Sequence, residues 1–216
     1  IGSCDNGSEF SVKGHKTFFE SGAFAQDYTL EQQSADYVAT FASETYGLKG
    51  ASLAFSTACS SSAAAVVKAA ELIRSGFADA VVAGGADIAS DTVLSGFDSL
   101  EAISKEKVNP FSKNRSGINL GDAAAFFVLS RDNLVKDGRA VTLAGSGESA
   151  DAYNITSPDP EGSGAALAMQ KALDDSSLKA GDIDYLNLHG TGTLLNDSME
   201  AKAVDKVFGS RKVLCS

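Results

Sequence analysis

Residues 51–83 contain a strand, a helix and a second strand in immediate succession. The apolar segment Ala51–Ser56 leads into an alanine-rich segment at 59–75, which Gly76 ends, and Ala80–Ala83 is apolar again. Short apolar runs are typical of strands buried on both faces, and small residues at helical spacing let a helix pack closely on a sheet. This succession favours parallel strands joined by a crossover helix.

The rest of the chain continues the alternation and predicts an α/β layered fold with a largely parallel sheet. Gly84-Gly85 is expected to end the strand that begins at Ala80. An Asp137-Gly138 turn is expected to join two adjacent strands as an antiparallel pair. The glycine- and serine-rich residues 146–164 predict a long loop. Further helices are expected over 26–46, 91–100, 165–173 and 197–208, and further strands over 123–129, 140–144 and 183–188.

The composition narrows the classes of partner. The chain has 216 residues, of which 44% are apolar, and 18 basic against 28 acidic side chains give a net charge of −10. This charge argues against nucleic acid or an anionic membrane as the main partner. No apolar run approaches the roughly 20 residues that span a bilayer. The three cysteines, at positions 4, 59 and 215, lack metal-ligand spacing, so a reduced, cytoplasmic protein is expected.

Cys59 is a candidate nucleophile because it lies where a predicted strand ends and a helix begins, within Thr57–Ser62. The unpaired N–H groups and the positive dipole of a helix start favour thiolate over thiol. The same groups can stabilise an oxyanion. The alternative is a cysteine packed as a small hydrophobic residue.

His189 is the second candidate for chemistry. It follows a predicted strand, and the glycines at 190 and 192 would let a ligand approach the backbone. At the carboxyl edge of an open α/β sheet, where ligands bind, it could act with Cys59. The alternative is a hydrogen-bonded structural histidine. His15, the other histidine, is expected to be exposed and without function.

Four segments together resemble the β-ketoacyl synthases of fatty acid and polyketide synthesis, in the thiolase-like superfamily. Their order and spacing also agree with that family. The segments are Thr57–Ser62, which resembles the nucleophile motif; Asn109–Phe111 with Arg115–Gly117 and Leu120–Asp122; Asp151–Pro158; and His189–Thr193 with Asn196, Asp197 and Glu200.

The resemblance implies a 3-oxoacyl-[acyl carrier protein] synthase, an acyltransferase that performs a decarboxylative Claisen condensation. Cys59 would accept an acyl chain, with its own N–H in the oxyanion hole, and His189 would donate to the thioester oxygen of a malonyl unit. Thr191 and Thr193 would bind the phosphopantetheine arm of the acyl carrier protein. No metal or organic cofactor is implied, and Asp197 is expected to cap a helix.

The resemblance also implies a thiolase-like fold, incomplete at both ends. Residues 1–137 would be the remainder of the N-terminal half, and 138–216 the start of the C-terminal half. A second histidine and a lysine are expected beyond Ser216, so this fragment alone should not complete the condensation. A homodimer is expected, with the 51–56 strand at its interface.

Three residues depart from the family pattern, and two other functions stay open. Asn154 stands where histidine is common, Leu194 where proline is usual and Asn196 where glycine is usual. One alternative is a noncatalytic partner like a chain-length factor, in a heterodimer with an active synthase. The other is a thiol hydrolase.

Overall fold

The computed structural model describes residues 1–5, 7–131 and 141–216. The chain forms two compact units. The first comprises Ile1–Gly96 with Leu120–Ala140, and the second comprises Phe97–Asn119 with Val141–Ser216. The expected boundary between residues 137 and 138 lies outside the described residues.

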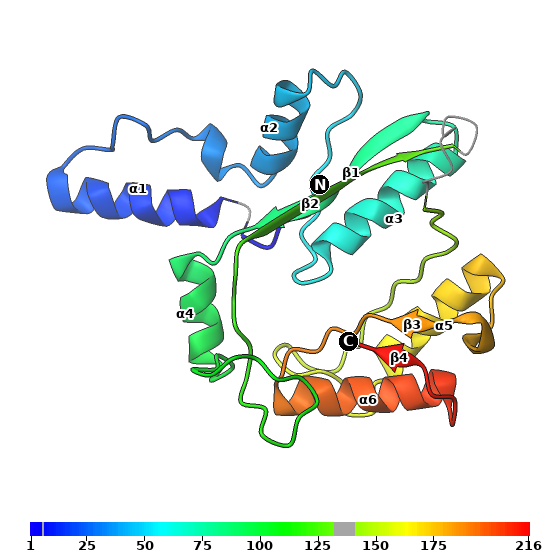
Figure 1. Ribbon diagram of the computed structural model, residues 1–216. Helices are drawn as coiled ribbons and strands as arrows, with labels where there is room; N and C mark the ends of the chain where they lie inside the picture. Colours follow the sequence, from blue (N-terminus) through cyan, green and yellow to red (C-terminus); the bar gives the residue numbers. More distant parts are fainter. Residues whose placement is uncertain (6, 132–140) are drawn as a thin grey trace. The chain divides into compact units, whose positions relative to one another are not determined.

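The first unit is built on a mixed sheet. Strands β1 (Ala80–Asp87) and β2 (Ala123–Ser130) pair antiparallel over their whole length, from Ala80 opposite Ser130 to Asp87 opposite Ala123. Gly2 forms parallel bridges to Phe55 and to Gly85. Helix α3 packs on β1, along the sheet in Figure 1. The helical elements that begin in this unit are α1 (Ser8–Ser21), η1 (Glu31–Gln33), α2 (Tyr37–Thr45), α3 (Ser61–Arg74) and α4 (Asp91–Ser99).

The second unit packs two helices against each other and has one short parallel strand pair. Helix α5 contacts helix α6. Strand β3 pairs with β4 in parallel, and Tyr185 lies opposite Leu214. The elements are α5 (Ser163–Ser176), η3 (Ala180–Asp182), β3 (Tyr185–Leu186), α6 (Leu194–Phe208) and β4 (Leu214–Cys215).

Small side chains make the close packing of α3 possible. Ala65 and Ala69 on α3 and Ala83 on β1 are almost fully buried. A Cβ on Gly85 would lie 2.7 Å from the Ser62 hydroxyl, so glycine is needed where the sheet meets the start of α3. The alanine-rich sequence of 59–75 therefore specifies how near this helix lies to the strand behind it.

The expectation that Gly84-Gly85 ends its strand is wrong, because β1 continues to Asp87. A Cβ on Gly84 would meet the carbonyl oxygen of Ala125 at 2.0 Å. These glycines allow the neighbouring backbones to approach, and the ladder with β2 continues through them.

Two other expected strands differ from the sequence prediction. Residues 51–56 contribute one isolated bridge, at Phe55, because the backbone that pairs with this segment is the short stretch around Gly2. Residues 141–144 form no strand, and β2 pairs with β1 instead. The expected Asp137-Gly138 turn lies outside the described residues.

Most helices agree with expectation, with shifts of a few residues at their ends. Helices α3, α4, α5 and α6 are confirmed, whereas α1 was not expected. The expected helix 26–46 is divided into η1 and α2, because Ser34 is extended and its hydroxyl bonds the Asp36 carboxylate. Of the helices in the described parts of the chain, none is long and apolar enough to cross a membrane.

Candidate active site

Cys59 lies in a tight turn that leads into helix α3. Ala58, directly before it, has a φ of 52°, in the left-handed region that side chains other than glycine rarely adopt. The Ser61 hydroxyl accepts the Thr57 N–H at 2.9 Å and donates to the Ala58 carbonyl at 2.6 Å. The Ser60 N–H also donates to the Thr57 carbonyl, at 3.2 Å. The serines of the motif thus hold the turn that presents Cys59.

The Cys59 thiol is exposed and belongs to no disulfide. It stands two residues before Ser61, the first residue of α3. A helix start carries partial positive charge, which favours the thiolate. This exposure contradicts the alternative of a buried, hydrophobically packed cysteine.

His189 follows β3 in the second unit, and a buried carboxylate holds its backbone. The Glu200 side chain accepts the His189 N–H at 2.6 Å and the Gly190 N–H at 2.9 Å. Glu200 is on α6 and is only 6% exposed, whereas His189 is exposed. The carboxylate fixes the backbone of the histidine and leaves its ring at the surface.

The two threonines predicted to bind substrate are half-buried and bond each other. The hydroxyls of Thr191 and Thr193 are 2.9 Å apart. Between them, Gly192 has a φ of 74°, and a Cβ there would lie 2.7 Å from the Gly117 carbonyl oxygen. The Gly117 N–H donates to the Gly192 carbonyl at 3.0 Å, so the two glycines bring residues 117 and 192 into direct backbone contact.

Asp197 joins three parts of the second unit. Its carboxylate is 1% exposed and accepts the Gly192 N–H at 3.1 Å and the Phe111 N–H at 2.7 Å. The Arg115 guanidinium lies 3.5 Å from it. Arg115 also donates to the Thr193 carbonyl at 3.3 Å. Two of the recognised motifs, far apart in the sequence, therefore meet at one buried ion pair.

The expectation that Asp197 caps a helix is wrong. The N-cap position of α6 is Thr193, which makes no side-chain cap bond, and Asp197 lies inside the first turn. Its carboxylate accepts N–H groups from two loops, a role that spacing along α6 alone does not reveal. No signal in the sequence around Asp197 indicates its ion pair with Arg115.

The sequence profiles of two known domains match this chain almost end to end. The Beta-ketoacyl synthase N-terminal domain matches residues 2–134, and the Beta-ketoacyl synthase C-terminal domain matches residues 140–216. The chain belongs to the β-ketoacyl synthase family.

Two curated relatives in this family are similar over nearly all of the chain. The 3-oxoacyl-[acyl-carrier-protein] synthase 2 of Vibrio cholerae is 36% identical over 100% of this chain and 56% of its own length. Nodulation protein E of Rhizobium meliloti is 35% identical over 94% of this chain and 51% of its own length. The chain thus spans about half the length of the curated relatives it matches.

Solved ketosynthase structures have the same fold. The ketosynthase ApeO of Xenorhabdus doucetiae, solved with its chain length factor ApeC, has a TM-score of 0.90 at 35% identity and covers 99% of this chain. A β-ketoacyl synthase of Burkholderia phymatum has a TM-score of 0.84 at 32% identity and covers 96%. In each case about half of the solved chain is covered, 53%. The expected thiolase-like fold, with mixed sheets and helices, is confirmed.

The four predicted site residues of this β-ketoacyl synthase chain are divided between the two units. Cys59 belongs to the first unit, and His189, Thr191 and Thr193 belong to the second. The structure brings the last three together on one loop. The apposition of Cys59 and His189 stays a prediction.

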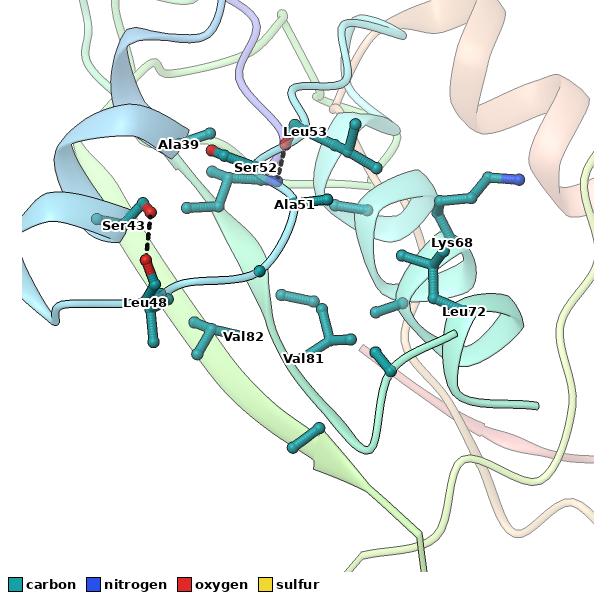
Figure 2. A pocket seen from close by; sticks show the side chains of 18 of the residues that line it. Ala39, Ser43, Leu48, Ala51, Ser52, Leu53, Lys68, Leu72, Val81 and Val82 are labelled. Carbon is teal, nitrogen blue, oxygen red and sulfur yellow. Dashed lines mark hydrogen bonds between the residues drawn. The ribbon is translucent and has the colours of Figure 1, made fainter. Parts of the chain in front are cut away.

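The first unit of this family member also contains an apolar cavity of about 450 Å³. Its lining includes Leu48, Leu53, Leu72 and Val81, and the amine of Lys68 points away from these apolar side chains (Figure 2). Cys59 does not line it. Across residues 1–5, 7–131 and 141–216, no group of three or more His, Cys, Asp and Glu side chains could hold a metal ion.

Proposed function

We propose that the full-length protein is a 3-oxoacyl-[acyl carrier protein] synthase with Cys59 as its nucleophile. The observation that supports this most is the exposed Cys59 thiol at the start of α3, in a turn held by the serines of the family motif. The proposed reaction uses no metal or organic cofactor, and the Cys59 thiol transfers the acyl chain without net hydrolysis.

The first half of the proposed reaction is acyl transfer. The Cys59 thiolate attacks the carbonyl carbon of an acyl thioester on an acyl carrier protein, and the C–S bond to the phosphopantetheine sulfur breaks. The N–H groups at the start of α3 support the oxyanion that forms on the way. The acyl chain is then a thioester of Cys59, and the carrier thiol takes up a proton.

The second half is condensation with a malonyl thioester. Loss of carbon dioxide leaves an electron pair on the α-carbon, which attacks the Cys59 thioester carbonyl and releases the Cys59 thiolate. A neutral His189 donates a hydrogen bond from its ring to the malonyl thioester oxygen and so stabilises the enolate. The Thr191 and Thr193 hydroxyls bond the phosphopantetheine arm.

We propose that Glu200 and Asp197 position this second half of the site. The Glu200 carboxylate accepts the backbone N–H groups of His189 and Gly190 and so fixes the backbone from which the His189 ring projects. Asp197 and Arg115 hold the loop that carries both threonines. Both carboxylates are buried, so their bonds are weakly screened by solvent.

The proposed partners are an acyl carrier protein and a second synthase-type subunit, in the cytoplasm. The similar ketosynthase ApeO was solved in complex with a chain length factor, which supports a heterodimer as an alternative to a homodimer. Residues 1–137 would belong to the N-terminal half of the fold and residues 138–216 to the C-terminal half. We propose no nucleic acid or membrane partner, in keeping with the net charge of −10.

Acyl labelling tests the nucleophile. The full-length protein is incubated with an acyl-carrier thioester and digested, and we expect mass spectrometry to find the acyl group on the peptide that contains Cys59. The Cys59→Ser variant should take up none, and Cys215→Ser should be labelled like the wild type. An acyl group on another residue, or hydrolysis of the thioester without a covalent intermediate on Cys59, would refute the assignment.

A further inference from the structure

A second cysteine lies close to the turn of Cys59. The first residues of the chain run parallel to the segment before that turn, because the Phe55 N–H donates to the Ile1 carbonyl at 2.9 Å and the Ser3 N–H donates to the Phe55 carbonyl at 3.1 Å. In this register Gly2 is opposite Phe55, so Cys4 comes level with Thr57. Thr57 is itself bridged to Cys59 across the turn.

The backbone of Cys4 is held in this place. Asp87, at the end of β1, accepts the Cys4 N–H at 2.6 Å and the Asp5 N–H at 3.2 Å through one carboxylate oxygen. On the other side, a Cβ on Gly2 would lie 2.2 Å from the Ser61 carbonyl carbon, so the segment packs directly on the start of α3. No side chain separates the two backbones at Gly2, and the Cys4 side chain is exposed.

The two thiols lie near enough to influence each other electrostatically. Partial burial raises the pKa of the Cys4 thiol, and the negative charges of Asp87 and then of Cys59 raise it further. The start of α3 favours the thiolate of Cys59. Cys59 is thus suited to attack an oxidant, and Cys4 to remain a protonated thiol beside it.

We propose that Cys4 and Cys59 form a reversible disulfide when a hydroperoxide oxidises the nucleophile. A disulfide joins residues whose Cα atoms are about 4.4–6.8 Å apart, which includes the spacing of about 4.8 Å between neighbouring strands. In the observed register Cys4 is opposite Thr57, and Thr57 is bridged to Cys59 across the turn, so the two cysteines lie on adjacent segments of backbone.

The oxidation proceeds in two steps. The Cys59 thiolate attacks one oxygen of the hydroperoxide, the O–O bond breaks, and Cys59 becomes a sulfenic acid while the other oxygen leaves as water or an alcohol. The Cys4 sulfur then attacks the Cys59 sulfur, the S–O bond breaks, and water leaves with the Cys4 proton. The two thiols lose two electrons in total, and the hydroperoxide gains them.

The consequence is protection of the nucleophile. A sulfenic acid without a neighbouring thiol is oxidised further to sulfinic acid, which thiol reductants do not reverse. The disulfide stops oxidation at a level that a dithiol reductant restores. This disulfide blocks acyl transfer if Cys59 has the proposed function, but its formation does not depend on that function.

The test compares three full-length proteins after exposure to hydrogen peroxide: the wild type, Cys4→Ser and Cys215→Ser. Digestion without reductant and mass spectrometry should find a peptide pair linked through Cys4 and Cys59 in the wild type and in Cys215→Ser. In Cys4→Ser we expect Cys59 to accumulate as sulfinic acid. Dithiothreitol should make the Cys59 thiol available for alkylation again in the wild type and in Cys215→Ser, but not in Cys4→Ser.

The linked peptide is read without any assay of synthase activity, so failure of the proposed function leaves this test intact. Circular dichroism of Cys4→Ser checks that it folds, and the linked peptide in the wild type is informative whether or not that variant folds. The absence of a Cys4–Cys59 link, with equal sulfinic acid in all three proteins, would overturn the proposal.

Discussion

Replacement of Glu200 by glutamine should destabilise the second unit and impair the condensation step. The Glu200 carboxylate accepts two backbone N–H groups, at 2.6 and 2.9 Å, and is 6% exposed. Glutamine keeps one acceptor oxygen but turns an NH₂ group toward the other N–H. A hydrogen bond to a charged group contributes about 1.5–3 kcal/mol, and a buried donor left unpaired costs about 1–3 kcal/mol. We therefore expect a loss of about 2–3 kcal/mol in the free energy of unfolding.

Urea unfolding followed by circular dichroism measures this loss in the full-length protein. Glu161→Gln is the matched control, because Glu161 forms its ion pair with Lys202 at 2.8 Å with 64% of its own side chain exposed. Exposed pairs contribute about 0–1 kcal/mol, so this control should unfold close to the wild type.

The same variant separates positioning from stability. Glu200 touches the backbone of His189 and lies in the other unit from Cys59, so Glu200→Gln should still accept an acyl group on Cys59 but form 3-oxoacyl product more slowly. The reasoning is refuted if Glu200→Gln unfolds like Glu161→Gln, or if acylation and condensation fall by the same factor.

Two further predictions concern a glycine and the pair of cysteines. Gly192→Ala should cost about 1–3 kcal/mol of stability through its strained backbone and the contact with Gly117, because a Cβ there would lie 2.7 Å from that carbonyl oxygen. Gly22→Ala, also at positive φ but with nothing within 4 Å, should cost less in the same urea unfolding measurement, and equal losses would contradict the steric argument. The midpoint pH, at which Cys4 is alkylated at half its maximal rate, should lie above that of a cysteine in an unfolded peptide. Partial burial and the negative charges of Asp87 and Cys59 raise the pKa of the Cys4 thiol. The Cys59→Ser variant should move this midpoint down, and an unchanged midpoint would place the two sulfurs out of electrostatic range.

The parts of the fold that can be predicted from the sequence are those specified by signals within one short segment. The alanine-rich segment and Gly76 predict helix α3 within a few residues of its observed bounds, and at the start of α4 the Ser90 hydroxyl accepts the Val93 N–H at 3.2 Å. Such signals are local, so they are visible in one segment.

What the sequence did not predict depends on contacts between distant segments. Gly84 predicts the end of a strand, but in the structure it lets β2 approach β1 closely. No residue near Gly84 in the sequence indicates where β2 lies. The position of Asp197 predicts a helix cap, but its carboxylate contacts Phe111 and Arg115. Phe111 lies 86 residues earlier in the sequence. Residues 51–56 had the apolar character of a strand, but strand formation needs neighbours on which to pair.

Condensation by a His189→Ala variant of the full-length protein tests most directly the claim that Cys59 and His189 serve one reaction. Mass spectrometry would follow the acyl group on Cys59 while the 3-oxoacyl product is measured after addition of a malonyl-carrier thioester. The account predicts that Cys59 is acylated and stays acylated, with product formation lost. Product formed at the wild-type rate by this variant, or an acyl group that never reaches Cys59 in the wild type, would contradict it.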